Sequence, residues 1–138
     1  MRFDFSMKNR IRFYLIVICG IVLFDAIASF ASRALAFNYS KLFWLSWCLW
    51  ALAGFFGCKY FDFLSGIGAG FVAGLSDSTV GWALSSAIGP NVPFTPYRPT
   101  PMIILLVVMS VSFMSIVFGF IGALVGYVVK WRWRRADA

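Results

Sequence analysis

The sequence predicts an all-α protein, an integral membrane four-helix bundle with both termini in the cytoplasm. Three observations predict it: an apolar composition, four apolar runs near spanning length, and the distribution of positive charge. Of the 138 residues, 62% are hydrophobic and 12% are charged, whereas soluble domains carry about 45–50% apolar and about 25% charged residues. A soluble domain of this length could not bury so much apolar surface, so we expect the lipid bilayer to be its solvent.

Four apolar runs divide the chain into expected spans. A membrane-spanning helix needs about 20 residues, within a range of about 17–25, and the runs lie near or above that length. They cover residues 13–31, 42–58, 63–88 and 102–129. The loop 89–101 carries all five prolines, and residues 130–138 form a basic tail that we expect in the cytoplasm. We therefore expect one membrane domain over residues 1–138.

Positive charge predicts the orientation of these spans. With both termini inside, nine of the 12 basic residues fall in cytoplasmic segments and three fall outside, as expected if cytoplasmic loops carry the excess. The inner set is Arg2, Lys8, Arg10, Arg12, Lys59, Lys130, Arg132, Arg134 and Arg135, and the outer set is Arg33, Lys41 and Arg98. An even number of spans also requires both termini on one side. We expect the membrane to be a bacterial cytoplasmic (inner) membrane.

The proline-rich outer loop is predicted to be stiff and extended, because proline fixes its own backbone angle and restricts the residue before it. We interpret it as a rigid connector between the third and fourth spans. The alternative is a partner contact through Tyr97 and Arg98.

Glycines line two predicted helix faces. Gly66, Gly70 and Gly74 recur every four residues in the third span, and such small-residue faces let membrane helices pack closely. On a regular helix Asp77 and Gly81 lie near the same direction. The fourth span carries a second set, Gly119, Gly122 and Gly126. These faces predict helix packing and association, either as a homo-oligomer or within a larger membrane complex.

Two aspartates lie inside the expected spans. Asp25 shares a helical stripe with Ala28, Ser29 and Ser32. Asp77 is flanked by three hydroxyl side chains, Ser76, Ser78 and Thr79. At 1.5 Å per residue the two aspartates lie about 18 and about 21 Å from the cytoplasmic edge. If the first and third spans touch, both carboxylates sit at one level.

A buried carboxylate pair predicts a site for a proton, a cation or a cationic solute. A charge at the bilayer centre costs at least about 2.5–3.5 kcal/mol, so intramembrane acids are functional by default. The candidate residues are Asp77, Asp25, Ser76, Ser78, Thr79 and Ser29. Two structural alternatives remain open: Asp77 caps a broken helix, or Arg33 reaches down to Asp25.

The sequence contains no pattern typical of an enzyme. Histidine is absent, the three cysteines form no CxxC pair, and no phosphate loop or nucleophile elbow occurs. We expect no enzymatic activity, no cofactor and no metal site. The tail "KWRWRR" is interpreted as an anchor at an anionic membrane surface, and we expect no nucleic-acid partner.

Two functions are therefore expected from the sequence. The first is a small carrier or channel for protons, cations or cationic solutes that uses the intramembrane carboxylates. The alternative is a non-catalytic accessory or assembly subunit of a larger membrane complex, in which the aspartates hold helices together.

Overall fold

The computed structural model describes residues 7–92 and 100–136, and within these ranges it is all-helical and free of strands. The elements are α1 (Met7–Ala34), η1 (Tyr39–Leu42), α2 (Phe43–Tyr60), α3 (Phe63–Ser76), η2 (Asp77–Gly81), α4 (Trp82–Ile88) and α5 (Pro101–Ala136). The predicted all-α class is confirmed. Three stretches, Met7–Ala34, Tyr39–Tyr60 and Pro101–Trp133, are long and apolar enough to cross a membrane. Residues 93–99, which include Tyr97 and Arg98 of the proline-rich loop, lie outside the described ranges.

The predicted third span is one continuous helix with a wider turn inside it. The segment η2 is a single π-helical turn between α3 and α4, and the backbone keeps right-handed helical angles at Ser76, Asp77 and Trp82. Asp77 therefore does not cap a broken helix, and that alternative is wrong. The helix ends where Gly89 takes a left-handed conformation, with φ of 72°, which glycine adopts without steric cost.

The start of α3 is fixed by a capping aspartate. The Asp62 carboxylate accepts a hydrogen bond from the Ser65 backbone N–H at 2.7 Å, as N-cap residues do. The same carboxylate forms an ion pair with Arg10 of α1 at 2.7 Å. Lys130 of α5 donates to the Phe61 carbonyl at 2.9 Å, so the turn between α2 and α3 is tied to two other helices.

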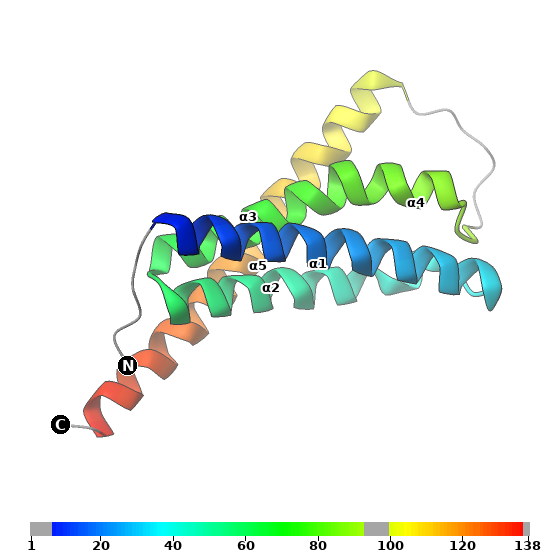
Figure 1. The fold of residues 1–138 in the computed structure, drawn as a ribbon. Helices are drawn as coiled ribbons and strands as arrows, with labels where there is room; N and C mark the ends of the chain where they lie inside the picture. Colours follow the sequence, from blue (N-terminus) through cyan, green and yellow to red (C-terminus); the bar gives the residue numbers. More distant parts are fainter. Residues whose placement is uncertain (1–6, 93–99, 137–138) are drawn as a thin grey trace.

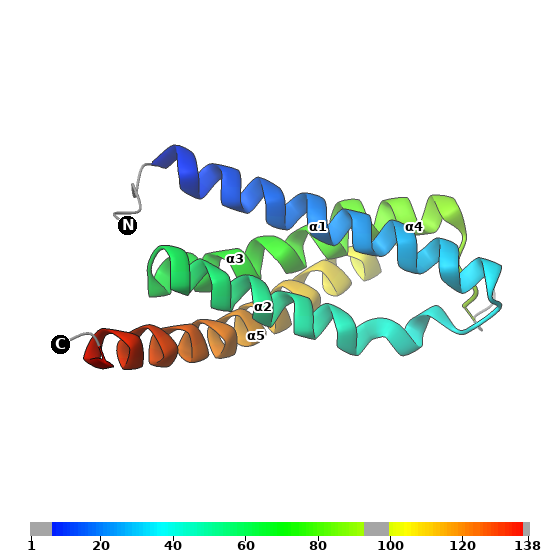
Figure 2. The ribbon, with the colours of Figure 1, turned by 60° about the horizontal axis from the view of Figure 1, so that its bottom comes forward.

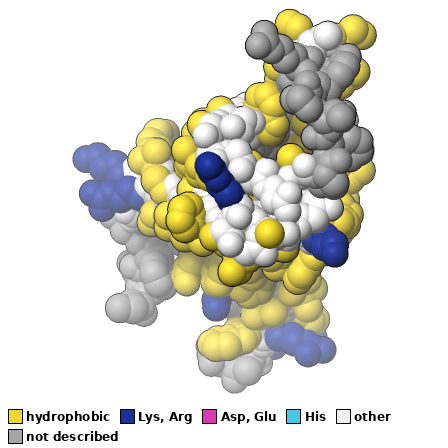
Figure 3. Space-filling model, turned by 90° about the vertical axis from the view of Figure 1, so that its right-hand side faces the viewer, with side chains coloured by type: hydrophobic (Ala, Val, Ile, Leu, Met, Phe, Trp, Pro, Cys, Tyr) yellow, Lys and Arg dark blue, Asp and Glu magenta, His cyan; other side chains and the backbone are white. Residues whose placement is uncertain are grey.

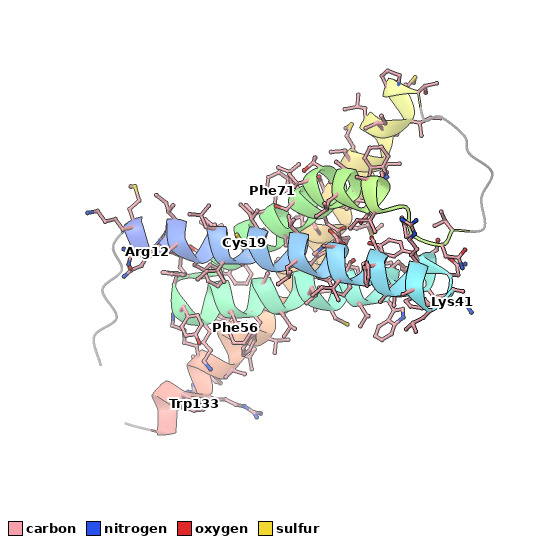
Figure 4. All side chains as sticks on the ribbon, turned by 45° about the vertical axis from the view of Figure 1, so that its right-hand side comes forward. Arg12, Cys19, Lys41, Phe56, Phe71 and Trp133 are labelled. Atoms are coloured by element: carbon pink, nitrogen blue, oxygen red, sulfur yellow. The ribbon has the colours of Figure 1, made fainter. Side chains whose placement is uncertain are left out.

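Helices α1, α2 and α3–α4 run side by side, and α5 crosses them obliquely (Figures 1 and 2). Both described chain ends lie near the turn between α2 and α3, and the connection from α1 to α2 lies at the opposite end. Figure 4 shows the same division in its labelled side chains, with Arg12 and Trp133 toward one end and Lys41 at the other.

The tightest packing joins α2, α3 and α5 through glycines. A methyl group built on Gly119 would lie 2.7 Å from the Cα of Gly70, and one built on Gly66 would lie 2.6 Å from the Gly54 carbonyl oxygen. Gly74 faces Ser115, Gly122 faces the Ala51 backbone and Gly126 faces the Phe55 carbonyl. Close backbone approach of this kind is how membrane helices gain contact area. Helix α1 stands outside this trio, where it packs along α3, η2 and α4.

The outside of the molecule is largely apolar. Leu23, Phe30 and Leu64 expose 60%, 68% and 77% of their surface. The buried interior holds mostly small residues such as Ala69 and Ala73, and Ile21 and Trp50 are the large hydrophobic side chains buried among them. Large apolar side chains outside and small ones inside are the reverse of a soluble protein, and this agrees with helices long enough to span a membrane. A bilayer solvates apolar side chains, so contacts between helices depend on close fit.

Candidate functional site

Asp25 is the most deeply buried charged side chain in the described ranges, with 1% of its surface exposed. The Tyr39 hydroxyl donates a hydrogen bond to its Oδ1 atom at 3.3 Å. Its Oδ2 atom is buried without a hydrogen-bond partner among the described residues. Burying an unpaired polar atom costs free energy. Only one of the two carboxylate oxygens of Asp25 offsets this cost with a hydrogen bond.

Polar side chains follow Asp25 along α1, where this helix meets α4 and the α1–α2 connection. Ser29, one turn along α1, donates to the Ser85 hydroxyl at 2.8 Å. The Tyr39 and Ser85 oxygens lie 3.5 Å apart. Ser32 donates to the Phe37 carbonyl at 2.7 Å. The stripe on α1 that the spacing predicts is therefore buried, with Asp25 against η2 and Ser29 against α4.

The segment η1 holds Tyr39 in place over Asp25. The Tyr39 backbone N–H donates to the Asn91 carbonyl at 3.0 Å, and the Asn91 amide returns a hydrogen bond to the Ala36 carbonyl at 2.8 Å. Asn38 caps the segment by accepting from the Ser40 backbone N–H at 2.9 Å. These bonds tie the α1–α2 connection to the chain after α4.

Gly81 is where η2 and α1 meet. A methyl group built on Gly81 would overlap Oδ2 of Asp25, so this approach requires glycine. The expectation that Gly81 shares a face with Gly66, Gly70 and Gly74 is wrong, since those three face α2 and α5. The reason is the π turn, which winds fewer degrees per residue than an α-helix and rotates every later position.

Asp77 lies in the π turn, half-buried, and close enough to Asp25 for the two carboxylates to repel each other. Its polar partners on α2 are the Ser46 hydroxyl and the Trp50 indole. The Trp50 Nε1 atom is buried and makes no hydrogen bond of regular geometry to any described residue. The first and third predicted spans therefore touch, and their aspartates come together beside α2.

A cavity of about 230 Å³ opens beside Asp77. Its walls come from five elements: Phe24, Tyr39, Ser40, Leu42, Phe43, Ser46, Trp47, Trp50, Asp77 and Val111. Ser40 and Phe43 are exposed, whereas Trp50 is 3% exposed, so the cavity runs inward from the α1–α2 connection. Figure 3 views this end of the molecule, and no acidic side chain is visible on the part not covered in grey.

Of the six predicted site residues, Asp77 alone lines this cavity, and Asp25 and Ser29 lie outside its lining. The other three bond to their own helix. Ser76, Ser78 and Thr79 donate to carbonyl groups of the preceding helical turn, those of Val72, Gly74 and Leu75 respectively. Serine and threonine inside helices commonly form such bonds. Their hydroxyls are therefore engaged with their own helix, and none of them lines the cavity.

Arg33 does not pair with Asp25. Its guanidinium donates to the Ile88 carbonyl at the end of α4, at 2.7 Å, so that structural alternative is wrong. Across residues 7–92 and 100–136, the recorded partners of Asp25 and Asp77 include no basic side chain.

Four residues of this region escaped the sequence analysis: Tyr39, Ser46, Trp50 and Ser85. Ser46 and Trp50 are spaced four apart and so share a face of α2, which is a weak signal in a run of apolar and aromatic residues. Comparison with known proteins adds no assignment, because no protein family, curated protein sequence or solved structure matches the chain.

Proposed function

We propose that this chain is a four-helix integral membrane protein, with both termini cytoplasmic, that carries protons, cations or cationic solutes through Asp25 and Asp77. The proposal is carried by the proximity of these two aspartates across α1 and η2, near enough for their charges to repel, beside a cavity that Asp77 lines. Two adjacent ionised carboxylates repel each other, and one shared proton or one bound cation relieves that repulsion. Exchange of a bound proton for a bound cation at these carboxylates is the elementary step of a carrier.

Three further features support a carrier over a purely structural pair. Oδ2 of Asp25 has no hydrogen-bond partner among the described residues, so it can take up a proton. Tyr39 contacts Asp25 and also lines the cavity, which links the buried acid to the opening. The π turn at Asp77 is a type of helix irregularity that often occurs at functional sites.

The direct test is flux through proteoliposomes. We expect the purified protein to dissipate an imposed proton or cation gradient, and we expect Asp77→Asn to abolish that flux while the protein still folds. Asp62→Asn is the matched control, because Asp62 caps α3 at the opposite end and asparagine also caps helices well. Flux that survives unchanged in Asp77→Asn would sink the proposal.

The proposed orientation has its own test. In a background without Cys19, Cys48 and Cys58, we would introduce Lys8→Cys and Lys41→Cys separately. A membrane-impermeant maleimide applied to intact cells should label only the second variant, because its position lies at the outer end. Labelling of the Lys8→Cys variant alone would reverse the orientation.

Exposed apolar side chains on the first half of α5 favour a second candidate function, that of an accessory subunit in a larger membrane complex. The N-terminal part of this helix, drawn in yellow, diverges from the others (Figure 1), and Leu105 and Phe113 expose 59% and 63% of their surface. A larger membrane partner could pack there. Native mass spectrometry after gentle extraction separates the candidates: a stoichiometric larger partner that is lost in Asp77→Asn supports the accessory role, and a homo-oligomer or monomer supports a carrier.

A further inference from the structure

The cavity beside Asp77 combines one carboxylate with a wall of aromatic rings. Five of its ten lining residues are aromatic: Phe24, Tyr39, Phe43, Trp47 and Trp50. Tryptophan, tyrosine and phenylalanine rings attract cations through their negatively charged faces, most strongly when the cation is desolvated. A carboxylate and several rings around one space are the two features that recognise an organic ammonium group.

The rings are fixed before any ligand arrives. Trp47 stacks on Phe118 of α5 with ring centres 4.9 Å apart, and it meets Phe43 edge-on at 4.8 Å. Trp50 packs against the same Phe118 ring at 6.4 Å. A wall that is already ordered loses little conformational entropy on binding, which favours affinity.

The cavity fits a small organic cation better than a metal ion. Its lining side chains offer oxygen atoms from only four residues, Tyr39, Ser40, Ser46 and Asp77, whereas Ca²⁺ takes 6–8 oxygen ligands. Its volume of about 230 Å³ corresponds to about eight water-sized units, at about 30 Å³ each. A quaternary ammonium with one short substituent has about that many non-hydrogen atoms.

One polar atom in the wall points to a further group on the ligand. Trp50 is 3% exposed, and its Nε1, which faces Asp77, makes no hydrogen bond of regular geometry to any described residue. A buried donor left unpaired is costly, and a ligand hydroxyl oxygen could accept from it. With the ammonium at Asp77, the hydroxyl would lie within the same small cavity.

We propose that this cavity binds a small hydroxylated quaternary ammonium compound, with its cationic head between Asp77 and the aromatic rings and its hydroxyl accepting from Trp50 Nε1. This inference rests on the proposed function and narrows its substrate to one chemical class. Choline has the required head group, hydroxyl and size, and it serves as the probe.

The experiment measures equilibrium binding of radiolabelled choline to the full chain in lipid nanodiscs. We expect saturable binding that tetramethylammonium also shows, and no binding of the neutral isostere in which carbon replaces the choline nitrogen. We expect Asp77→Asn to weaken choline binding at least about 30-fold, because it removes the charged partner of a desolvated cation.

Two tryptophan variants separate the hydroxyl contact from general damage. Trp50→Phe keeps a ring and loses the N–H, so we expect choline affinity to fall about 2- to 10-fold and tetramethylammonium affinity to stay the same. Trp82→Phe is the matched control, because Trp82 is exposed on α4 and lies outside the cavity lining. Equal losses for both ligands in Trp50→Phe would overturn the hydroxyl contact.

The remaining outcomes distinguish this inference from the proposed function. If choline fails to bind while Asp77-dependent proton or cation flux persists, the inference is wrong and the carrier stands. If choline binds equally well to Asp77→Asn, its site lies elsewhere and the inference is also wrong. If neither binding nor flux is found, both proposals fall.

Discussion

At the scale of single residues, the contact between Asp25 and Gly81 decides how α1 joins the rest of the molecule. Oδ2 of Asp25 occupies the space that a side chain at position 81 would need. The buried acid thereby rests directly against the π turn that carries Asp77. A carboxylate buried in the protein interior costs free energy, so we expect the stability of the fold to depend on this contact.

Gly81→Ala should therefore push α1 away from η2. Overpacking of a filled interior typically costs about 1–3 kcal/mol, and we expect that loss in the free energy of unfolding together with loss of flux. Thermal unfolding in detergent, followed by tryptophan fluorescence, measures the first effect. Gly20→Ala is the control, because nothing lies within 4 Å of a methyl group built on Gly20. Equal behaviour of the two variants would contradict the tight contact.

Tyr39→Phe should expose how much Asp25 depends on its one hydrogen bond. The change removes the hydroxyl that lies 3.3 Å from Oδ1 and leaves a buried carboxylate without that donor, at a cost of about 1–3 kcal/mol. Chemical denaturation in detergent micelles measures the loss. Tyr127→Phe serves as control, because this exposed residue of α5 keeps its ring contact with Phe63. An unchanged midpoint for Tyr39→Phe would argue that the hydrogen bond is unimportant.

At the scale of elements, the π turn sets the direction of each half of the third span. Before it, Gly66, Gly70 and Gly74 face α2 and α5. After it, Gly81 and Ser85 face α1. A regular helix would keep its small residues on one slowly drifting face. The irregular turn lets one helix serve two contacts, and it places Asp77 between them.

The stability that Asp62 contributes at the N-terminus of α3 depends on pH. Partial burial of Asp62 alone would raise its pKa, but hydrogen bonds from Ser65 and the charge of Arg10 outweigh this effect, and the pKa is lowered. A carboxyl group with a lowered pKa in the folded state stabilises the fold above its ordinary pKa of about 3.9. That contribution is lost as the pH falls through the lowered value.

Asp62→Ala should accordingly reduce the free energy of unfolding by about 1 kcal/mol near neutral pH, as loss of an N-cap typically does. The difference between this variant and the natural chain should shrink as the pH drops below about 4. Unfolding measured in detergent between pH 6 and about pH 3 tests both statements. Asp62→Asn keeps the cap and loses only an exposed ion pair, so it should cost about 0–1 kcal/mol. A pH-independent difference for Asp62→Ala would contradict this account.

At the scale of the whole molecule, glycine contacts between α2, α3 and α5 hold the bundle together. Gly119 lies against both Gly54 and Gly70, so one residue sits where three helices meet. Gly119→Ala should separate the backbones and cost about 1–3 kcal/mol. Gly68→Ala is the comparison, because its nearest neighbour is the movable end of the Tyr14 side chain at 3.1 Å. Thermal unfolding of both variants in detergent should show a clearly larger loss for Gly119→Ala, and the reverse order would refute this packing.

Much of the fold followed from local signals. The predicted third span, residues 63–88, agrees with the observed helix bounds. Asp62 caps its start, and Gly89 with Pro90 ends it. The predicted fourth span falls short of α5 at its C-terminal end, where the helix continues into the basic tail. Hydropathy marks where a chain is apolar, and it does not mark where an amphiphilic tail stops being helical.

The candidate site followed from the sequence only in part. Asp25 and Asp77 stood out because carboxylates are rare in apolar runs. Ser76, Ser78 and Thr79 were chosen by their position beside Asp77, yet neighbours in sequence point to different sides of a helix. Tyr39, Ser46 and Trp50 reach the two acids from other elements, and Ser85 bonds to Ser29 beside them. Nothing in their local sequence indicates that approach.

The sequence by itself determined the helical class, the apolar exterior and the positions of the two acids along the chain. Composition and spacing are sufficient for these, because hydrogen bonding forces an apolar segment in lipid to be helical. Only the tertiary structure decided that Gly81 meets Asp25 and that Asp77 faces Trp50. It also decided that a cavity opens beside Asp77 and Trp50. The π turn is the physical reason: it shifts the rotation of the chain by a fraction of a turn, and no local residue pattern encodes how far.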